Sequence, residues 1–270
     1  MKNILALFAL ILLTSCEDVV DINLDTAAPK LVIDANILWK KGTSGNEQRI
    51  KLSTTTGFYS TEIPTVSGAT VFITNSSATV FTFTEIIPNT GEYICTNFIP
   101  VVNENYTLTV IVNGVTYTAI QTLLATPDID SVEQTTVEGI GGDLLQVKFF
   151  FQDNGLEDNN YLIIVKKSDE VIPELGAVSD EFFQGNQMFG FYSDDELEAG
   201  DQLTFGLQGM SLRYYNYINK LINIVGSTGN PFATPPATLR GNIINQTDAN
   251  NFPLGYFHMS EVDTEEYTIQ

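Results

Sequence analysis

The chain has 270 residues with 33 acidic and 12 basic side chains, and its formal net charge is −21. Nucleic acid and anionic lipid headgroups are therefore poor partners, because binding them normally requires clustered Lys and Arg side chains. Apart from a short run at the start, no apolar stretch approaches the roughly 18 residues that a membrane-spanning helix needs.

The beginning of the chain has the three parts of a bacterial export signal. Lys2 gives a positive start, an apolar core runs from Ile4 to Leu13, and small polar residues follow. As a helix this core rises only about 15 Å, whereas a bilayer core is about 30 Å thick. The segment is too short to remain as an anchor, so we assign residues 1–15 as a signal peptide.

The end of this signal, Leu13-Thr14-Ser15-Cys16, resembles the lipobox of bacterial lipoproteins. The resemblance implies cleavage before Cys16 and acylation of its sulfur and of its new amino group. Several acyl chains on one residue hold a soluble domain firmly to a membrane, because each buried CH2 contributes about 0.8 kcal/mol. An ordinary secretory signal with an incidental cysteine is the alternative.

Acidic residues follow this cysteine at once, at Glu17, Asp18 and Asp21. The arrangement resembles surface-exported lipoproteins of Bacteroidota, in which an acidic patch after the acylated cysteine acts as the export signal. We therefore expect a protein that is lipid-anchored in the outer membrane and exposed at the cell surface, with residues 16–29 as an acidic tether. A solvated, charged tether without an address is the alternative.

Strand patterns recur at short intervals through residues 30–125. The clearest stretch is "YTLTVIVNGVTYTAIQT", in which two alternating runs flank Asn113-Gly114. Both of these residues tolerate positive φ, so the pair predicts a two-residue type I′ hairpin turn. Short strands at this spacing are typical of an immunoglobulin-like β-sandwich. Cys95 lies in such a strand pattern, and we interpret it as a core residue that has no second free cysteine to pair with.

The pattern changes at "LLATPDIDSV" (Leu123–Val132), which contains Pro127 and two aspartates. We place a domain boundary there and assign residues 126–270 to a β-rich C-terminal domain, so that the whole chain is mainly β. Strand patterns resume with "LLQVKFFF", "YLIIVKK" and "DQLTFGLQ". We interpret the final stretch, "LGYFHMSEVDTEEYTI", as two short strands.

One segment of this second part, "SLRYYNYINKLINIVG", departs from the strand pattern. Its apolar residues fall at spacings of three and four, which predicts one amphipathic helix over residues 211–225. Ser211 is available as the N-cap and Gly226 as the C-terminal stop.

Three tyrosines of this helix are candidate partner contacts. Tyr214, Tyr215 and Tyr217 cannot all face one core, so at least one should be exposed. An exposed tyrosine is a good interface anchor, because it combines an apolar ring with a polar tip. We add Phe232, which lies in the following Pro-rich loop "GNPFATPPATLRGNI". Ordinary helix-surface positions are the alternative.

A polar stretch between two strands, "DNGLEDNN", is the best metal candidate. Asp153, Asn154, Asp158 and Asn159 bring carboxylate and amide oxygens together, and Ca²⁺ takes six to eight oxygen ligands. The spacing is not that of an EF-hand. A polar turn whose side chains cap local backbone groups is the alternative, and no other cofactor is expected.

Catalytic patterns are weak along the whole chain. His258 is the only histidine, it stands between Phe257 and Met259, and no G-x-S-x-G stretch is present. A glycosidase needs two carboxyl groups at a defined separation, which a sequence cannot show, in a cleft that is often lined by tryptophan. Trp39 is the only tryptophan. We therefore expect a protein that is not an enzyme.

Several stretches taken together resemble one family: "CEDVVDINL", "PKLVIDANI", "FFQDNGLEDNNYLIIV", "GNPFATPPATLRGNI" and "LGYF". This is a family of Bacteroidota lipoproteins numbered 4249 among the domains of unknown function. The resemblance covers essentially the whole mature chain. It implies a two-part, β-rich lipoprotein, often encoded beside TonB-dependent outer-membrane receptors, and it implies no catalytic residue.

These observations together predict a non-enzymatic accessory or binding partner of a TonB-dependent receptor in nutrient uptake. A glycan-binding or adhesive surface module is the first alternative, and a glycoside hydrolase is the second.

Overall fold

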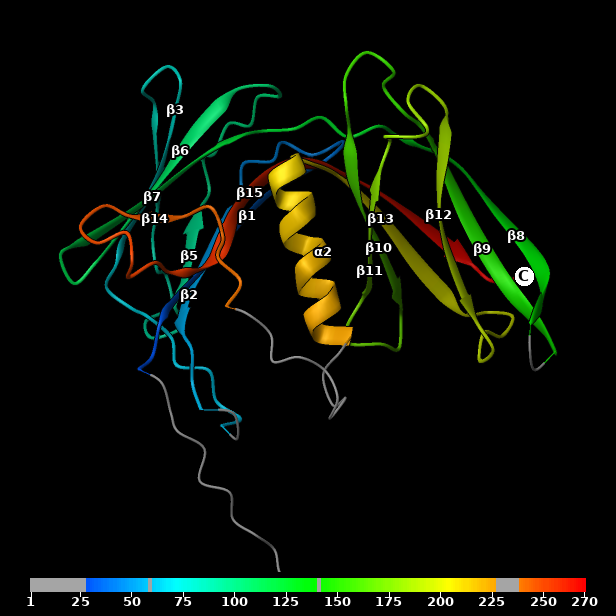
Figure 1. The fold of residues 1–270 in the computed structure, drawn as a ribbon, viewed down its shortest axis with the longest axis horizontal. Helices are drawn as coiled ribbons and strands as arrows, with labels where there is room; N and C mark the ends of the chain where they lie inside the picture. Colours follow the sequence, from blue (N-terminus) through cyan, green and yellow to red (C-terminus); the bar gives the residue numbers. More distant parts are fainter. Residues whose placement is uncertain (1–27, 58–59, 140–141, 227–237) are drawn as a thin grey trace, which may run out of the picture.

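The computed structural model describes residues 28–57, 60–139, 142–226 and 238–270. In these ranges the chain forms three β-sheets and one helix, so the predicted mainly β class is confirmed. Two lobes lie side by side with the helix between them (Figure 1). No helix within these ranges has the length and apolar character that a membrane span requires.

The largest sheet has seven strands and belongs to both lobes. Its order across the sheet is β11 (Glu174–Ser179), β10 (Asn160–Lys167), β13 (Gln202–Met210), β15 (Leu254–Thr268), β1 (Leu31–Lys40), β2 (Gln48–Thr54) and β5 (Glu92–Cys95).

The first lobe is a sandwich in which the β15–β1–β2–β5 part of this sheet faces a five-stranded sheet. That second sheet has the order β14 (Ile244–Asn245), β7 (Val115–Thr122), β6 (Asn105–Val112), β3 (Thr70–Asn75) and β4 (Val80–Phe83). Alternate residues of the strands point inward. In β2, buried Ile50 and Leu52 alternate with exposed Arg49 and Lys51. The core between the sheets contains Phe81, Phe98 and Tyr106.

The hairpin between β6 and β7 has the predicted turn. Val112 pairs with Val115, and the two residues between them, Asn113 and Gly114, have φ of 51° and 79°. These values suit a type I′ turn, so this part of the sequence interpretation is confirmed.

The second lobe is a sandwich of the β11–β10–β13–β15 part of the large sheet against a three-stranded sheet. The order of the latter is β12 (Gln187–Asp194), β9 (Gly142–Gln152) and β8 (Ile129–Gly139). Phe149, Phe151 and Phe205 are fully buried in its core, which is separate from the core of the first lobe.

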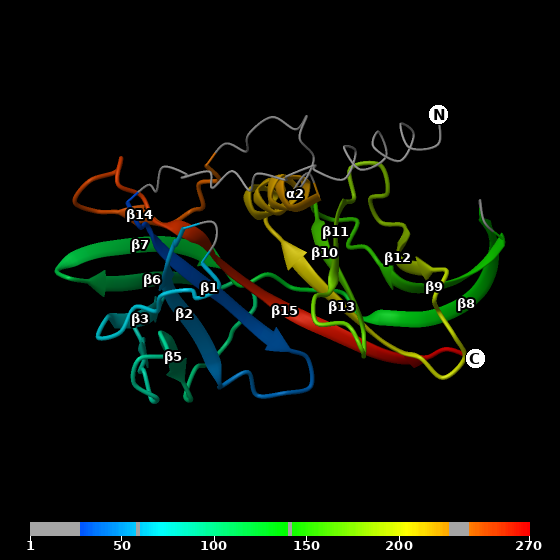
Figure 2. The same cartoon turned by 90° about the horizontal axis from the view of Figure 1, so that it is seen from below.

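Strand β15 joins the two lobes. Its first part pairs in parallel with β1, from Val32↔Leu254 to Lys40↔Val262. Its last part pairs antiparallel with β13, from Gln208↔Val262 to Gln202↔Thr268. The expectation of two short strands here is therefore wrong, because one continuous strand crosses the molecule (Figure 2).

The course of β15 also bears on the organisation expected from the sequence. The chain does pass from one lobe to the other between β7 and β8, where the pattern changes. After that point, however, Ile243, Phe257 and Met259 return to the core of the first lobe. Residues 126–270 therefore contribute to both lobes, because the apolar residues of early β15 complete the sheet edge that β1 provides.

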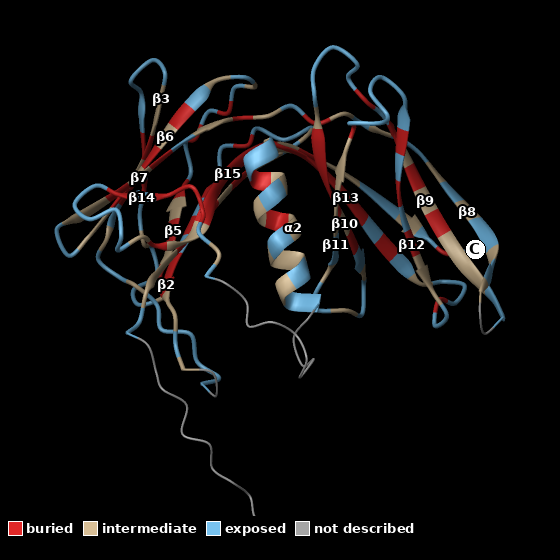
Figure 3. Ribbon diagram, viewed as in Figure 1, coloured by how far each residue is buried: buried red, intermediate tan, exposed pale blue. Residues whose placement is uncertain are grey.

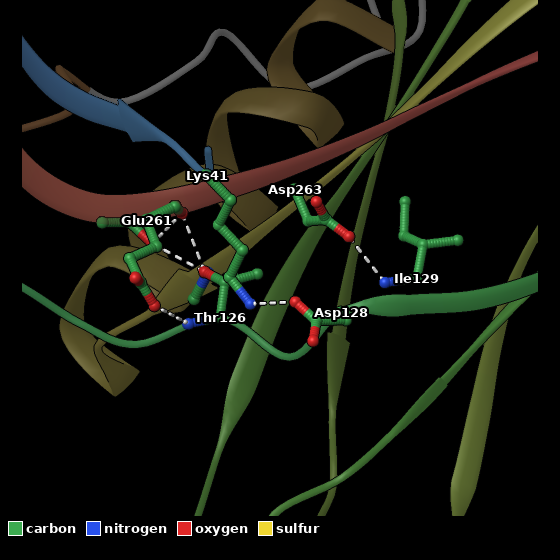
Figure 4. Close-up of polar contacts among 8 residues, drawn as sticks. Lys41, Thr126, Asp128, Ile129, Glu261 and Asp263 are labelled. Atoms are coloured by element: carbon green, nitrogen blue, oxygen red, sulfur yellow. Dashed lines mark hydrogen bonds and ion pairs between the residues drawn. The ribbon is translucent and has the colours of Figure 1, made fainter. Parts of the chain in front are cut away.

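The linker between the lobes is fastened to β15 by hydrogen bonds. Thr126 donates from its backbone N to Glu261 Oε2 (3.2 Å) and from Oγ1 to the Glu261 carbonyl oxygen (2.8 Å). Ile129 N donates to Asp263 Oδ2 (2.7 Å), and Lys41 forms an ion pair with Asp128 (2.6 Å; Figure 4). The segment in which the chain passes from the first lobe to the second is thus bonded both to β15 and to Lys41, which directly follows β1.

Helix α2 (Leu212–Gly226) covers the face of the large sheet that points away from the two sandwich cores. Its buried residues, Tyr214 and Ile218, pack against Leu162, Met210 and Tyr256. Figure 3 shows buried residues on one side of the helix and along the strands of both lobes. The predicted helix is confirmed.

The N-cap of this helix is also the predicted one. Ser211 Oγ accepts a hydrogen bond from Tyr214 N (3.2 Å). This bond satisfies one of the backbone N–H groups that a helix start leaves without a partner.

We predict that damage to the second core will loosen the first core, because β15 belongs to both. Phe205→Ala, in the second core, should lower the free energy of unfolding by about 3–5 kcal/mol. In the mature chain without Cys16, buried Cys95 is the only thiol and reports on the first core. The denaturant midpoint at which Cys95 becomes labelled by a thiol reagent should therefore fall, and the fall should correspond to the same loss of free energy.

Phe189→Ala, on an exposed position of the second lobe, is the matched control and should change the labelling midpoint little. An unchanged Cys95 midpoint in Phe205→Ala would mean that the lobes unfold independently.

Candidate functional site

A groove of about 820 Å³ opens where the two lobes meet. One wall is the linker after β7, with Thr126 and Pro127, together with Asn103 of the first lobe. The other wall comes from the second lobe: the β9–β10 loop, the β11–β12 loop and the start of α2. Grooves between domains are common places for ligands, because two bodies shape one concave surface.

The β9–β10 loop is braced by a buried carboxylate. Asp153 Oδ1 accepts a hydrogen bond from Tyr161 Oη (2.7 Å), and Oδ2 accepts one from Gly185 N (2.7 Å). Burial, and then the neighbouring Asp153, raise the pKa of Tyr161 above its usual range, so this hydroxyl stays a donor. Both oxygens of Asp153 are therefore occupied by the fold.

Other side chains of the loop are used in the same way. Asp180, buried at the end of the neighbouring β11, accepts a hydrogen bond from Asn159 N (2.7 Å). Asn154 accepts one from Leu156 N (3.3 Å) and donates one to Glu157 (2.8 Å). These bonds are those of a polar turn that caps its own backbone.

The calcium hypothesis named Asp153, Asn154, Asp158 and Asn159. Asp153 does not suit it, because donors already occupy both of its carboxylate oxygens. In the described ranges no three Asp, Glu, His or Cys side chains are grouped so that they could hold a metal ion. For Asp158 and Asn159, which line the groove, calcium stays a prediction.

Two amide oxygens in the groove wall have no partner. Asn159 Oδ1 and Asn160 Oδ1 are buried and accept no hydrogen bond within the described residues. Asn160 is only 6% exposed, and both residues line the groove. A buried acceptor without a donor costs about 1–3 kcal/mol, so the folded chain keeps these oxygens at an energetic cost.

Sequence reasoning missed Asn160. The available signal was a polar residue at the start of β10, which is otherwise apolar up to Val165. In the sequence, an Asn at that place looks like the ordinary end of a strand. Only the structure shows that its side-chain oxygen is buried in the wall of the groove, as is that of Asn159.

The charge of the groove is one-sided. Its lining includes Glu157, Asp158, Asp180 and Glu181, and none of its lining residues, all of them in the described ranges, is Lys, Arg or His. Together with the two unpartnered amide oxygens, these acceptors favour a ligand that is rich in hydrogen-bond donors, such as hydroxyl or amino groups.

His258 lies away from this groove, beneath α2. It is fully buried, and its ring stacks on Tyr214 with centroids 3.9 Å apart. Neither ring nitrogen has a hydrogen-bond partner within the described part of the chain. Burial lowers the pKa of His258 to about 3, so the ring is neutral. Base catalysis also requires a carboxylate or hydroxyl partner, and within the described residues neither ring nitrogen has one.

The helix tyrosines require a correction. Tyr214 is only 6% exposed, and Tyr215 and Tyr217 are half-buried, so none of them is freely exposed. The ring of Tyr214 packs on Tyr256 and His258 of β15, and that of Tyr217 packs on Tyr256; the sequence did not place β15 under the helix. Tyr214 is therefore unsuitable as a partner contact.

The other sequence-predicted site residues, Cys16, Glu17, Asp18, Asp21 and Phe232, lie outside the described residues. Cys95 is a buried free thiol whose Sγ donates to Asn97 Oδ1 (3.2 Å). Burial raises the pKa of Cys95, as is usual for an unreactive core cysteine.

Comparison with known proteins gives one family match. The model of the family described as Domain of unknown function (DUF4249) matches residues 17–266. Curated proteins give no match.

Solved structures give distant likenesses. A cytokine receptor complex is 10% identical, with 67% of this chain and 83% of that chain covered and a TM-score of 0.26. A two-domain fibronectin type-III segment of chicken tenascin is 10% identical, with 68% and 91% covered and a TM-score of 0.23. Bovine butyrophilin is 11% identical, with 69% and 93% covered and a TM-score of 0.25. At these TM-scores the likenesses support no argument about this chain.

We predict that removing the Asn160 amide, whose oxygen has no hydrogen-bond partner in the described residues, will stabilise the fold. Asn160→Leu keeps a similar volume and should raise the free energy of unfolding by about 1–3 kcal/mol, measured by chemical denaturation. The matched control is Asn242→Leu, because Asn242 is equally buried but exchanges two hydrogen bonds with the backbone of Phe257 (2.7 and 2.8 Å). The control should destabilise the protein, and equal destabilisation by both variants would contradict the assignment.

We also predict a component of pH-dependent stability from His258. Its pKa is about 3 in the folded chain and 6.5 in the unfolded chain, so the unfolded chain binds the extra proton between these values. Stability from this group is present above pH 6.5 and is lost as the pH falls, by about 1.4 kcal/mol per pH unit. His258→Phe should lack this component.

The difference in unfolding free energy between wild type and His258→Phe, followed from pH 7 to pH 5, isolates the effect, because the carboxylates are common to both proteins. A constant difference would show that His258 titrates normally in the folded chain.

Proposed function

The chain belongs to the family described as Domain of unknown function (DUF4249), and on that premise we propose that it is a lipid-anchored, non-enzymatic binding module at the outer face of the outer membrane. Its proposed role is that of an accessory to a TonB-dependent receptor in nutrient uptake. The groove between the lobes is the proposed contact site for cargo or partner.

The anchoring part of this proposal is supported by the sequence. Cys16 follows a short apolar segment that cannot span a bilayer, and acidic residues come directly after it. The family match begins at residue 17, immediately after this cysteine. Acyl chains on Cys16 would keep the two lobes close to the membrane in which a receptor barrel lies.

The observation that carries the binding role is the pair of buried, unpartnered oxygens of Asn159 and Asn160. A ligand that donates hydrogen bonds to these oxygens would offset the free-energy cost of burying them without donors. The groove is also built on strand ends and loops that Asp153 and Asp180 hold in place.

Catalysis is less well supported by the same groove. Glycoside hydrolysis requires two carboxyl groups that are free to act on opposite sides of one bond. Of the four carboxylates that line the groove, Asp180 already accepts a backbone hydrogen bond and Glu157 accepts one from Asn154. Only Asp158 and Glu181 accept no hydrogen bond within the described residues, and nothing in the groove places these two on opposite sides of one bond. We therefore propose binding as the function of this site.

Co-purification from native membranes tests the receptor partnership. We expect the tagged wild-type protein to bring a β-barrel receptor with it and the Asn160→Leu variant to recover less of it. The Lys166→Gln variant, changed at an exposed position of the second lobe, is the control and should behave as wild type. Repeated recovery of the lipoprotein alone would sink the partnership.

A glycan-binding module is the second candidate, favoured by the acceptor-rich lining that suits sugar hydroxyl groups. A glycan array with the lipid-free chain discriminates between the two. Affinity without any receptor, abolished in Asn160→Leu, would favour the glycan-binding module over the receptor accessory.

A further inference from the structure

A second groove, of about 540 Å³, lies along α2, on the face of the large sheet that this helix covers. Its polar and aromatic lining residues come from three separate segments: Arg213, Asn216, Tyr217 and Lys220 from α2, Arg240 from the segment before β14, and Tyr256 from β15. None of them lines the groove between the lobes.

The charge of this second groove is opposite to that of the molecule. The whole chain has only 12 basic side chains and three arginines, at a net charge of −21. Three basic side chains, including two of those arginines, meet in this one groove, and no Asp or Glu is among its lining residues in the described ranges. Such a concentration in an acidic protein favours an anionic ligand.

Within the described residues these three cations are also not neutralised by an ion pair. The ion pairs of the described residues are formed by Lys41, Arg49 and Lys167. Arg213, Lys220 and Arg240 therefore have no carboxylate partner in the part of the chain that the structure describes. Asp34 lies opposite Tyr256 in the register of β1 and β15, but it hydrogen-bonds to Asn36.

The groove is held in shape by the fold. Arg213, Asn216, Tyr217 and Lys220 stand at i, i+3, i+4 and i+7, so they form one stripe along α2. Arg213 Nη2 donates to the Gly241 carbonyl oxygen (3.1 Å), which ties the stripe to the segment that carries Arg240.

Arg240 is itself positioned by an aromatic ring. Its guanidinium lies over Phe252, 4.8 Å from the ring centroid, and its Nη2 donates to the Ala249 carbonyl oxygen (3.3 Å). A guanidinium has five N–H donors, so most of those of Arg213 and Arg240 remain for a ligand.

An independent sign of a ligand is the hydroxyl group of Tyr256. This residue is only 4% exposed, and its Oη is buried with no hydrogen-bond partner in the described chain. Burial raises the pKa of Tyr256, and the charge of nearby Arg213, followed by the hydroxyl of Ser211, offsets part of that rise. The Ser211 hydroxyl lies near but forms no hydrogen bond with it, so the Tyr256 hydroxyl still lacks a bond in the described residues. The hydroxyl is thus a protonated donor beside a guanidinium, which is a suitable pair for an oxyanion.

We propose that this groove binds a phosphate group through Arg213, Lys220, Arg240 and the hydroxyl of Tyr256. Two guanidinium groups, an ammonium group and a hydroxyl match the charge and the acceptor number of a phosphate. The half-buried Tyr217, whose ring lies 4.9 Å from that of Tyr256, offers a flat apolar face to whatever carries the phosphate.

This phosphate has two possible sources: a soluble phosphorylated molecule or the headgroup of a membrane lipid. The second rests on the proposed anchoring at Cys16. Lys30, at the end of the tether, lies over the same Phe252 ring as Arg240, at 4.2 Å, so the described chain begins next to this groove. The whole-chain charge argues against anionic lipid as a partner, but it is an average that this local cluster reverses.

Calorimetry with the full-length protein in non-ionic detergent tests the site with inorganic phosphate as the probe. We expect phosphate to bind the wild type, and Arg213→Gln to weaken binding at least tenfold. Tyr256→Phe should also weaken it, without lowering the thermal midpoint, because the lost hydroxyl forms no hydrogen bond with the residues that the structure describes. Lys166→Gln removes the same charge at an exposed position that does not line this groove, and it should leave binding unchanged.

The source of the phosphate is tested with mixed micelles that contain either phosphatidic acid or diacylglycerol with the same acyl chains. A higher thermal midpoint with phosphatidic acid only, lost in Arg213→Gln, identifies a lipid headgroup. Binding of inorganic phosphate without this lipid effect identifies a soluble ligand.

The proposal is overturned if neither probe binds, or if both variants bind as the wild type does. These results are independent of receptor recovery, so a failed co-purification would leave the phosphate site standing, and the reverse also holds.

Discussion

The hydrogen bonds of β15 are the constraint on which the arrangement of the molecule depends. At Val262 the parallel pairing with β1 ends and the antiparallel pairing with β13 begins, so one residue belongs to both registers. Two sandwiches joined by a bare linker would move relative to each other by default. Here such motion would break sheet hydrogen bonds, and the contacts of Thr126 with Glu261 hold the linker as well. The walls of the groove between the lobes are therefore fixed.

The two grooves differ in chemistry but share one feature. The groove between the lobes is lined by carboxylates and amide oxygens, whereas the groove along α2 is lined by guanidinium and ammonium groups. Each contains buried polar atoms that have no hydrogen-bond partner among the described residues, at Asn159 and Asn160 in one and at Tyr256 in the other. Native proteins leave few such groups, and they retain them where function requires it. Because the two linings have opposite charge, we treat the grooves as separate sites for different ligands.

Local features could be predicted from the sequence, and long-range ones could not. The Asn113-Gly114 turn and the Ser211 cap follow from backbone chemistry within a few residues. The pairing of Val32 with Leu254 leaves no local signal, since parallel partners can lie anywhere in the chain. Burial of the helix tyrosines depends on that pairing, because β15 brings Tyr256 and His258 beneath α2. The basic groove was hidden for the same reason, as its residues come from three distant segments.

The parallel pairing of β1 with β15 also governs the order in which the protein can be completed. The first lobe contains the earliest strand of the chain, yet its core includes Phe257 and Met259 from near the end. During synthesis the chain emerges from its N-terminus, so the edge of β1 stays open until the residues of β15 have been made. An open strand edge invites association with other chains. A chaperone that shields unpaired strand edges would thus have the longest task at the part of this molecule that emerges first.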